Sequence, residues 1–200
     1  FNPIIMANVI KLRKGLDVNL KGKAAKEEFQ VKKPAVYALM PDDFTGMKPK
    51  VVVKENDVVK VGDSLFVDKN HPEIKFVSPV SGRVTMVERG DRRKVLSVRV
   101  EADAEQQYVD FGKKNVGQMT AQEVKDLLLE SGLFGFFRQR PYDVTANPSD
   151  TPKAIFVSAF NSMPLAADFE YVLRGREADF QAGLDALAKM AKTYLGVSSK

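Results

Sequence analysis

The segment 130–142 carries the side-chain types that bind a flat ring with polar edges. Its sequence is ESGLFGFFRQRPY, in which three Phe and one Tyr interleave with two Arg and two Gly. Aromatic planes stack on a flat ring, and Arg138 or Arg140 can donate hydrogen bonds to a carbonyl or a phosphate. Gly132 and Gly135 would let a ligand approach the backbone. The competing interpretation is a helix end whose Phe cluster is buried in the core, because large apolar residues are mostly buried.

A second set of polar residues follows an apolar run at 154–160. Asn161, Ser162 and Asp168 would lie at the carboxyl edge of that strand, where ligands of open α/β sheets bind. The sequence has no GxGxxG pattern, no Walker loop and no Gly-rich turn for a phosphate. The alternative interpretation is therefore a loop with a Met-Pro turn and no ligand.

Lys69 lies between two turn-rich segments, ENDVVKVGD at 55–63 and SPVSGRV at 78–84. This pattern resembles the biotinyl/lipoyl-like barrel-sandwich fold over roughly residues 30–100, and carrier members of that fold modify a Lys in an exposed hairpin. The sequence VDKNHP around Lys69 has neither the Met-Lys-Met of biotin carriers nor an apolar-flanked tip. We interpret Lys69 as a solvated turn lysine.

The composition excludes several classes of chemistry. The chain has no Cys, which excludes thiolate-held zinc, Cys-ligated iron–sulfur clusters and a thiol nucleophile within it. It has one His, His71, which precedes a Pro in a polar turn and is interpreted as a surface residue. HExxH, GxSxG and EF-hand patterns do not occur. We predict no catalytic residue, no metal ligand and no redox cofactor bound by this chain.

The net charge of +5 is concentrated near the start of the chain. The first 60 residues hold 12 Lys/Arg and 7 Asp/Glu, and the remaining segments cancel. Such a region, with Lys11, Arg13 and Lys14 in it, can face an acidic protein partner or an anionic surface, or simply be solvated. Nucleic acid is not an expected partner, because zinc-finger spacing and an RNP-like motif do not occur. No apolar run reaches the ~20 residues of a membrane helix.

The region 6–105 is predicted to form a β module of the barrel-sandwich type. Dense Gly and Pro punctuation separates short runs rich in Val, Ile and Phe, which is typical of a small barrel or sandwich. In the run VLSVRV, Leu96, Val98 and Val100 are expected to face the core while Ser97 and Arg99 face water. The strands are expected at 35–39, 51–53, 64–67, 75–77, 83–87 and 95–100.

The region 106–200 is predicted to begin an α/β domain that continues beyond it, so that the whole chain is a mixture of α+β and α/β. Residues 101–107 are expected to be a linker. Thr120 and Glu123 form a capping box for a helix to about residue 131. The run 154–160 suits a strand buried on both faces of a parallel sheet. An amphipathic helix and a possible further strand follow. Residues 1–5 precede Met6, the expected native start, and are taken as an expression remnant.

The order of several segments resembles one family, the A subunit of the Na⁺-translocating NADH:quinone oxidoreductase. These segments are IKLRKGLD at 10–17, LKG at 20–22 and YALMPDDFTGMKP at 37–49. They continue with GDSLFVDK, SPVSGRV, ESGLFGFFRQRP and AIFVSAFNSMPLAAD in the family's order. The resemblance covers nearly all of the chain after Met6. The C subunit of the related Rnf complex is also similar, but it carries Cys clusters that this chain lacks.

The resemblance implies a peripheral subunit on the cytoplasmic side of a bacterial inner membrane, without transmembrane helices. The complex oxidises NADH, reduces ubiquinone and pumps Na⁺. Its FAD, FMN, riboflavin and iron–sulfur centre belong to other subunits, which are the expected partners of this chain, together with ubiquinone. The alternative is a purely structural docking subunit that has no ligand site.

The resemblance also singles out candidate residues for contact with quinone or with another subunit. The second region it favours is 37–44. The candidates are Phe134, Phe136, Phe137, Arg138, Arg140, Tyr37 and Phe44.

Overall fold

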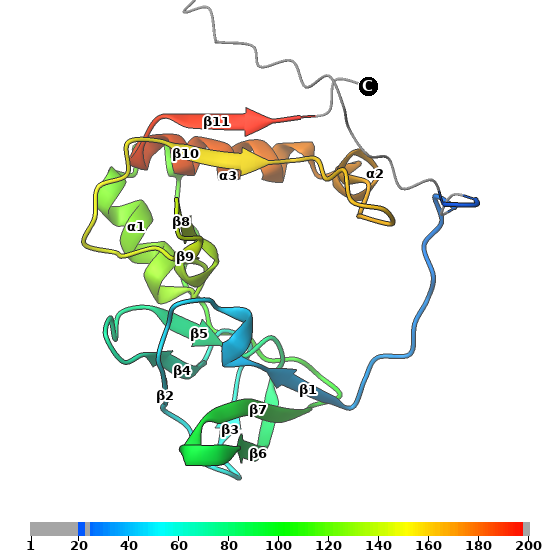
Figure 1. Cartoon of the computed structure of the whole chain (residues 1–200), viewed down its shortest axis with the longest axis vertical. Helices are drawn as coiled ribbons and strands as arrows, with labels where there is room; N and C mark the ends of the chain where they lie inside the picture. The colour runs from blue at the N-terminus through cyan, green and yellow to red at the C-terminus, as the bar shows by residue number, and fades with distance from the viewer. Residues whose placement is uncertain (1–19, 23–24, 198–200) are drawn as a thin grey trace, which may run out of the picture.

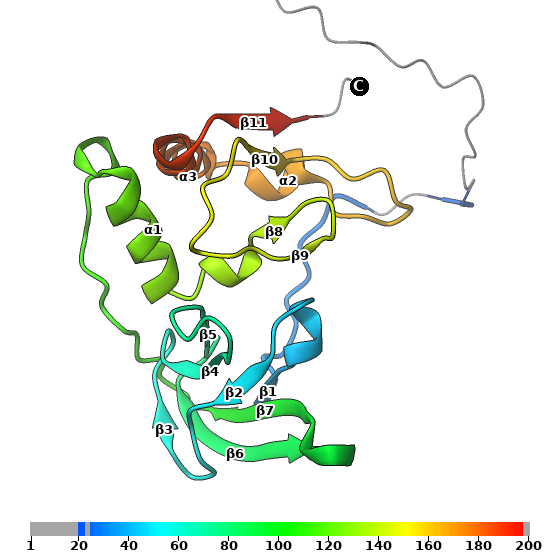
Figure 2. The same ribbon diagram turned by 60° about the vertical axis from the view of Figure 1, so that its left-hand side comes forward.

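The structure is a computed structural model that describes residues 20–22 and 25–197 (Figure 1). The expected native start at Met6, the residues before it, and Lys11, Arg13 and Lys14 lie outside these residues. Two parts follow each other along the chain. A β module forms one end of the molecule, and a part with helices lies beyond it in both views (Figures 1 and 2).

The β module consists of two antiparallel sheets. One has the strand order β1-β7-β6-β3 and the other β2-β4-β5. The module also holds two short 3₁₀ helices, η1 at Pro41–Asp43 and η2 at Asp91–Arg93. Its strands are β1 Val36–Leu39, β2 Pro49–Val51, β3 Val58–Val59, β4 Ser64–Asp68, β5 Lys75–Val77, β6 Gly82–Arg89 and β7 Val95–Ala102. Five of the predicted strands are confirmed with ends that differ by at most two residues, whereas the strand expected at 51–53 shares only Val51 with β2, and β3 was not predicted.

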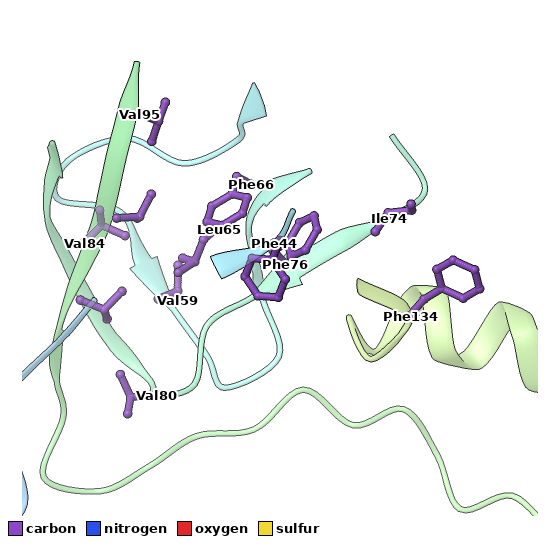
Figure 3. Close-up of a cluster of buried hydrophobic side chains, with 12 residues drawn as sticks. Phe44, Val59, Leu65, Phe66, Ile74, Phe76, Val80, Val84, Val95 and Phe134 are labelled. Carbon is purple, nitrogen blue, oxygen red and sulfur yellow. The ribbon is translucent and has the colours of Figure 1, made fainter. Parts of the chain in front are cut away.

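The core of the module lies between the two sheets (Figure 3). Val84 and Val98 enter it from one sheet, and Leu65, Phe66 and Phe76 enter it from the other, each with at most 2% of its surface exposed. Burial of each such side chain contributes about 1.5–3 kcal/mol to folding. The buried residues are Phe44, Val59, Leu65, Phe66, Ile74, Phe76, Val80, Val84, Val95, Val98, Val100 and Phe134.

Strand β7 follows the predicted alternation over only part of its length. Val98 and Val100 are buried as predicted, but Leu96 is exposed and Ser97 is buried. The register between β6 and β7 shifts here, because Glu88 pairs with Ser97 while the next residue of β6 pairs with Val95. Leu96 is thus the extra residue of a β-bulge, which reverses the faces of its neighbours.

The segment 101–107, expected as a linker, belongs to the module, because Glu101 and Ala102 lie in β7 and residues 103–107 are bonded to it. The Asp103 N–H donates to the Ser81 carbonyl (2.8 Å), and the Ser81 N–H donates to the Gln106 side chain (2.8 Å). The Gln107 N–H donates to the Ser81 hydroxyl (2.9 Å). Ser81 itself is buried. Buried polar groups need hydrogen-bond partners, and the residues that follow β7 supply them for Ser81. This explains why the polar segment 103–107 lies against the module.

The second part joins helices to short strands. The capping box of α1 is confirmed, because the Glu123 N–H donates to the Thr120 hydroxyl and the Thr120 N–H donates to the Glu123 carboxylate. Strands β10 and β11 pair in parallel, with α3 between them in the chain. The elements are η3 Val116–Gln118, α1 Ala121–Glu130, η4 Phe134–Phe136, β8 Arg138–Gln139, β9 Val144–Thr145, β10 Ile155–Ser158, α2 Phe169–Leu173, α3 Glu177–Met190 and β11 Thr193–Gly196.

The prediction that the 154–160 strand is buried on both faces is wrong for this structure. Along β10, Ile155 and Val157 are half-buried, whereas Phe156 is 79% exposed. The ring of Phe156 stacks on that of Tyr194 in β11, with 5.2 Å between centroids. In the part of the chain that the structure describes, this sheet has two strands, and the face that carries Phe156 is exposed. In the part of the chain that the structure describes, no helix has the length and hydrophobicity that crossing a membrane requires.

Candidate functional site

The segment 130–146 lies directly against the β module. Gly132 ends α1 with φ +76°, as expected for a helix C-terminal glycine. A Cβ at Gly132 would lie 2.6 Å from Cγ1 of Val77, and one at Gly135 would lie 2.7 Å from Cε1 of Phe76. Both of these barrel side chains belong to β5. The space that the two glycines leave open is therefore filled by the barrel and not open to a ligand.

Phe134 and Phe137 pack inward from this segment. Phe134 is 5% exposed and belongs to the same buried cluster as the barrel core. Its ring stacks on that of Phe137, with centroids 5.5 Å apart and planes at 29°. Phe137 is partly buried and packs against the same cluster. The interpretation of the Phe cluster as core thus holds for these two rings.

Phe136 and Phe44 end a row of rings that leads from the core to the surface. The ring of Phe66 stacks on Phe76 (5.1 Å between centroids), and Phe76 contacts Phe44 (4.4 Å). Phe44, which is buried, meets Phe136 edge-on at 5.6 Å. Phe136 is 68% exposed. The edge-on contact with Phe44 stabilises the position of the Phe136 ring, while most of the surface of that ring stays accessible.

Arg138 joins the hairpin β8–β9 to the loop after η1. Its Nη1 donates to the Thr45 hydroxyl (3.0 Å) and to the Asp143 carbonyl (3.2 Å). Its Nη2 donates to the Asp43 carbonyl (3.3 Å). A guanidinium has five N–H donors, so two remain after these three bonds. Arg138 therefore fixes the loop that carries Phe44 and keeps some capacity to donate outward.

The same loop is bonded to β9 through its backbone. The Thr145 N–H donates to the Thr45 carbonyl (2.8 Å), and the Thr145 hydroxyl donates to it as well (3.2 Å). Gly46 has φ +87°, and a Cβ there would lie 2.8 Å from Cβ of Val144. Sequence reasoning missed Thr45 and Asp143. The one available signal was Gly46, one of the glycines that separate the apolar runs, which indicates bending but no partner.

Arg140 and Tyr37 differ in how they relate to this row. Arg140 is exposed, and its Nη1 lies 3.7 Å from a carboxylate oxygen of Asp143, an ion pair too open to hold it firmly. Tyr37 lies in β1, where it pairs with Val100, and packs half-buried on the barrel core. We call Phe44, Phe136, Arg138 and Arg140 the Phe136 patch. Tyr37, Phe134 and Phe137 lie in or against the core behind it.

Polar residues of the other candidate segments are used in local structure. The Asn161 side chain accepts from the Met163 N–H (2.9 Å). Asp168 caps α2 and pairs with Lys26 (2.8 Å), and this hydrogen bond to Lys26 holds the pKa of the Asp168 carboxyl below its ordinary value. Lys69 is exposed in the turn between β4 and β5, and nearby His71 lies 3.7 Å from a Glu73 carboxylate oxygen.

An open cavity of about 1000 Å³ lies between η3 and α3, away from the Phe136 patch. Lys113, Lys114, Val116, Ala188 and Lys189 are among its lining residues. The Lys189 ammonium donates to the Gly117 carbonyl (3.0 Å) and so ties the two elements together. Within residues 20–22 and 25–197, His, Asp and Glu nowhere form a group of three that could hold a metal ion.

Comparison with known proteins identifies relatives of both parts. The family model described as the NqrA N-terminal barrel-sandwich hybrid domain matches residues 10–103, and the model described as the NqrA second alpha/beta domain matches residues 119–200. Two curated relatives are each named as the A subunit of a Na(+)-translocating NADH-quinone reductase. One, from Pseudomonas aeruginosa, is 35% identical over 190 residues, which cover 94% of this chain and 42% of the relative. One from Serratia proteamaculans is 37% identical over 186 residues, which cover 91% of this chain and 41% of the relative. The chain thus spans about two fifths of the length of the curated relatives it matches.

Proposed function

The chain belongs to the NqrA family, the A subunits of the Na⁺-translocating NADH-quinone reductases, and from this we propose that it acts as a peripheral subunit of a bacterial Na⁺-pumping NADH:ubiquinone oxidoreductase. In this proposal it contributes to quinone binding and to assembly of the complex on the cytoplasmic side of the inner membrane. NADH oxidation, the flavins and the iron–sulfur centre are assigned to other subunits.

The observation that carries the quinone role is the exposed ring of Phe136 in the same short segment as two guanidinium groups, those of Arg138 and Arg140. A quinone head is a flat ring with two carbonyl oxygens. Phe136 can stack on such a ring or meet it edge-on, because its support on Phe44 fixes its position. Arg140 is the better donor to a quinone carbonyl, since its side chain is 78% exposed and its one ion pair is long. Arg138 acts as a positioning residue, because three of its five N–H groups already hold the loop.

The other candidates have supporting roles in this proposal. Phe44 backs the ring of Phe136, and Phe134 and Phe137 anchor the segment that carries it. Tyr37 packs behind the loop that leads to Phe44, on strand β1. We expect substitutions at these positions to act through stability more than through direct loss of a quinone contact.

The test is calorimetric titration of the full-length subunit with a short-chain ubiquinone. Phe136→Ala is expected to weaken binding by roughly tenfold, which corresponds to about 1.4 kcal/mol. Phe156→Ala is the matched control, because Phe156 is a similarly exposed Phe on β10 and lies outside the patch. Unchanged affinity in Phe136→Ala contradicts the patch as the binding site. If the unaltered protein shows no saturable binding, the quinone role is wrong and the assembly role is left.

The alternative, a purely structural docking subunit, is favoured by one observation. Most of the 130–146 segment is used to hold the chain together, since Gly132, Gly135 and Phe134 all fit the barrel. The two functions separate when the whole complex is isolated with the Phe136→Ala subunit. Loss of quinone reductase activity in an intact complex supports quinone binding, whereas loss of the other subunits on purification supports docking.

A further inference from the structure

The tip of the β6–β7 hairpin presents three arginines, two of which have an unusual backbone conformation. Strands β6 and β7 are eight residues long each, and residues 90–94 connect them. Figure 2 shows η2 at the end of this hairpin, on the side of the module that faces away from α1 and α3. Arg92 and Arg93 at the tip are fully on the surface, as is Arg89 at the end of β6.

The turn at the tip requires two residues in the left-handed region. Arg92 has φ 54° and ψ 28°, and Arg93 has φ 62°. The Lys94 N–H donates to the Asp91 carbonyl (3.1 Å), which closes a type I′ turn with the two arginines at its centre. Asn-Gly is the preferred pair in such turns, because a Cβ makes the left-handed conformation unfavourable. The sequence therefore places two arginines where folding alone favours Asn and Gly.

Two contacts bond the tip to its surroundings, but neither of them pairs an arginine of the tip with a carboxylate. The Lys94 ammonium lies 2.6 Å from the Asp42 carboxylate of η1, and Arg89 Nη1 donates to the Arg93 carbonyl (3.4 Å). Among the residues that the structure describes, Arg89, Arg92 and Arg93 have no carboxylate within ion-pair distance. Asp91 is the one acidic residue between them in the sequence. The tip thus carries an excess of positive charge on a turn that is bonded to η1 through Lys94 and Asp42.

We propose that this arginine tip, residues 89–93, is a docking site for a carboxylate-rich segment of another protein subunit. Guanidinium groups bind carboxylates through two parallel hydrogen bonds, and the turn places the backbones of Arg92 and Arg93 next to each other at the tip. Residues 90–94 include no apolar side chain that could insert into a bilayer. Basic clusters that bind lipid headgroups by charge alone usually hold about four to eight Lys/Arg, more than the three arginines of this tip, which favours a protein partner over a lipid surface. The inference rests on the proposed function only in taking the chain to be one subunit of an assembly, and it does not depend on quinone binding.

The test uses two double variants of the full-length subunit. Arg92→Asn with Arg93→Gly installs the pair that a type I′ turn prefers, so this variant is expected to keep or raise its Tm. The same variant is expected to retain at least about tenfold less of the remaining subunits on affinity purification. Arg92→Lys with Arg93→Lys keeps the charge but loses bidentate bonding. Its retention of the other subunits is expected to lie between that of the unaltered subunit and that of the Asn-Gly variant.

Three outcomes decide the proposal. Loss of the other subunits by the Asn-Gly variant at unchanged or higher Tm, with weaker retention at high salt, supports it. Retention equal to that of the unaltered subunit overturns it. A lipid partner is examined with vesicles that contain phosphatidylglycerol. If the Asn-Gly variant loses vesicle binding while the complex still assembles, the docking site is for lipid and the proposal of a protein partner is wrong. Loss of assembly with normal quinone titration separates this site from the Phe136 patch.

Discussion

The ring of Phe136 meets the ring of Phe44 edge-on, with 5.6 Å between centroids and 69° between planes. One ring belongs to the barrel and the other follows α1, and 91 residues of chain separate them. Phe44 is buried among barrel rings, whereas Phe136 is largely exposed. An exposed ring is thus held by the core of a different part of the chain, so the stability of the barrel and the order of the surface are coupled.

Replacing each ring by Ala is expected to have unequal effects on stability. Phe44→Ala leaves a cavity beside Phe66 and Phe76 and should lower the free energy of unfolding by about 3–5 kcal/mol. Phe136→Ala removes an exposed ring and should cost less than about 1 kcal/mol. Urea denaturation followed by circular dichroism measures both values. Equal losses of unfolding free energy in the two variants would show that the difference in burial between Phe44 and Phe136 does not decide how much each ring stabilises the chain.

Adding a methyl group at Gly132 or Gly135, the two glycines that pack against β5, should destabilise the chain. Gly135→Ala brings a Cβ to within 2.7 Å of the Phe76 ring, and Gly132→Ala adds a left-handed conformation to a similar clash with Val77. We expect losses of about 1–3 kcal/mol for the first and more for the second. Gly183→Ala in α3 is the control, since a Cβ there meets nothing within 4 Å. It should stabilise the helix by about 0.5–1 kcal/mol. Thermal unfolding of the three variants ranks them.

Arg138→Lys is expected to loosen the loop 41–46 although it keeps the charge. An ammonium cannot reach the Thr45 hydroxyl and the carbonyls of Asp43 and Asp143 with the planar geometry of a guanidinium. Hydrogen exchange at the Thr145 N–H, which is bonded to the Thr45 carbonyl, should become several-fold faster. Arg140→Lys is the matched substitution in the same hairpin and should leave this exchange unchanged. Unaltered protection in Arg138→Lys would contradict the bracing role.

The capping box of α1 should make stability depend on pH in acid. Hydrogen bonds from the Thr120 N–H and hydroxyl hold the pKa of the Glu123 carboxyl below its ordinary value. The charged form is thus favoured in the folded chain. Its contribution is present above the ordinary Glu pKa of about 4.3 and disappears as the pH falls through the lower folded value. The stability gap between the unaltered chain and Glu123→Gln should therefore narrow from pH 7 to pH 3. Glu130→Gln, at the other end of α1, is the control, and an equal narrowing there would assign the effect to general charge.

Local patterns in the sequence predicted much of the fold, because each depends on neighbouring residues. Turn punctuation located the strands of the barrel, and the Thr120–Glu123 spacing located the start of α1. The bulge at Leu96 could not be predicted in this way, since it depends on the register with Glu88 in β6. The exposed face of β10 depends on which elements pack over the sheet, and the apolar run at 154–160 does not encode this.

The candidate site shows the same division. Aromatic and arginine content identified the segment that holds Phe136 and Arg138, but not which rings face inward. That difference depends on β5, whose Phe76 and Val77 occupy the space beside Gly135 and Gly132. The net charge of its segment gave no sign of the arginine tip, because residues 61–110 hold 8 Lys/Arg against 9 Asp/Glu. Arg89, Arg92 and Arg93 are neighbours in the sequence, and the turn places them at the exposed end of a hairpin.

The fit of Gly132 and Gly135 against β5 limits how related subunits can be recombined. In a chimera that joins the barrel of one homologue to the α/β part of another, β5 comes from one parent and the segment with Gly132 and Gly135 comes from the other. If the donor of the second part has any side chain larger than hydrogen at either glycine position, it will collide with Phe76 or Val77. Functional chimeras should therefore inherit β5 and η4 from the same parent, even though more than 50 residues separate the two elements in the sequence.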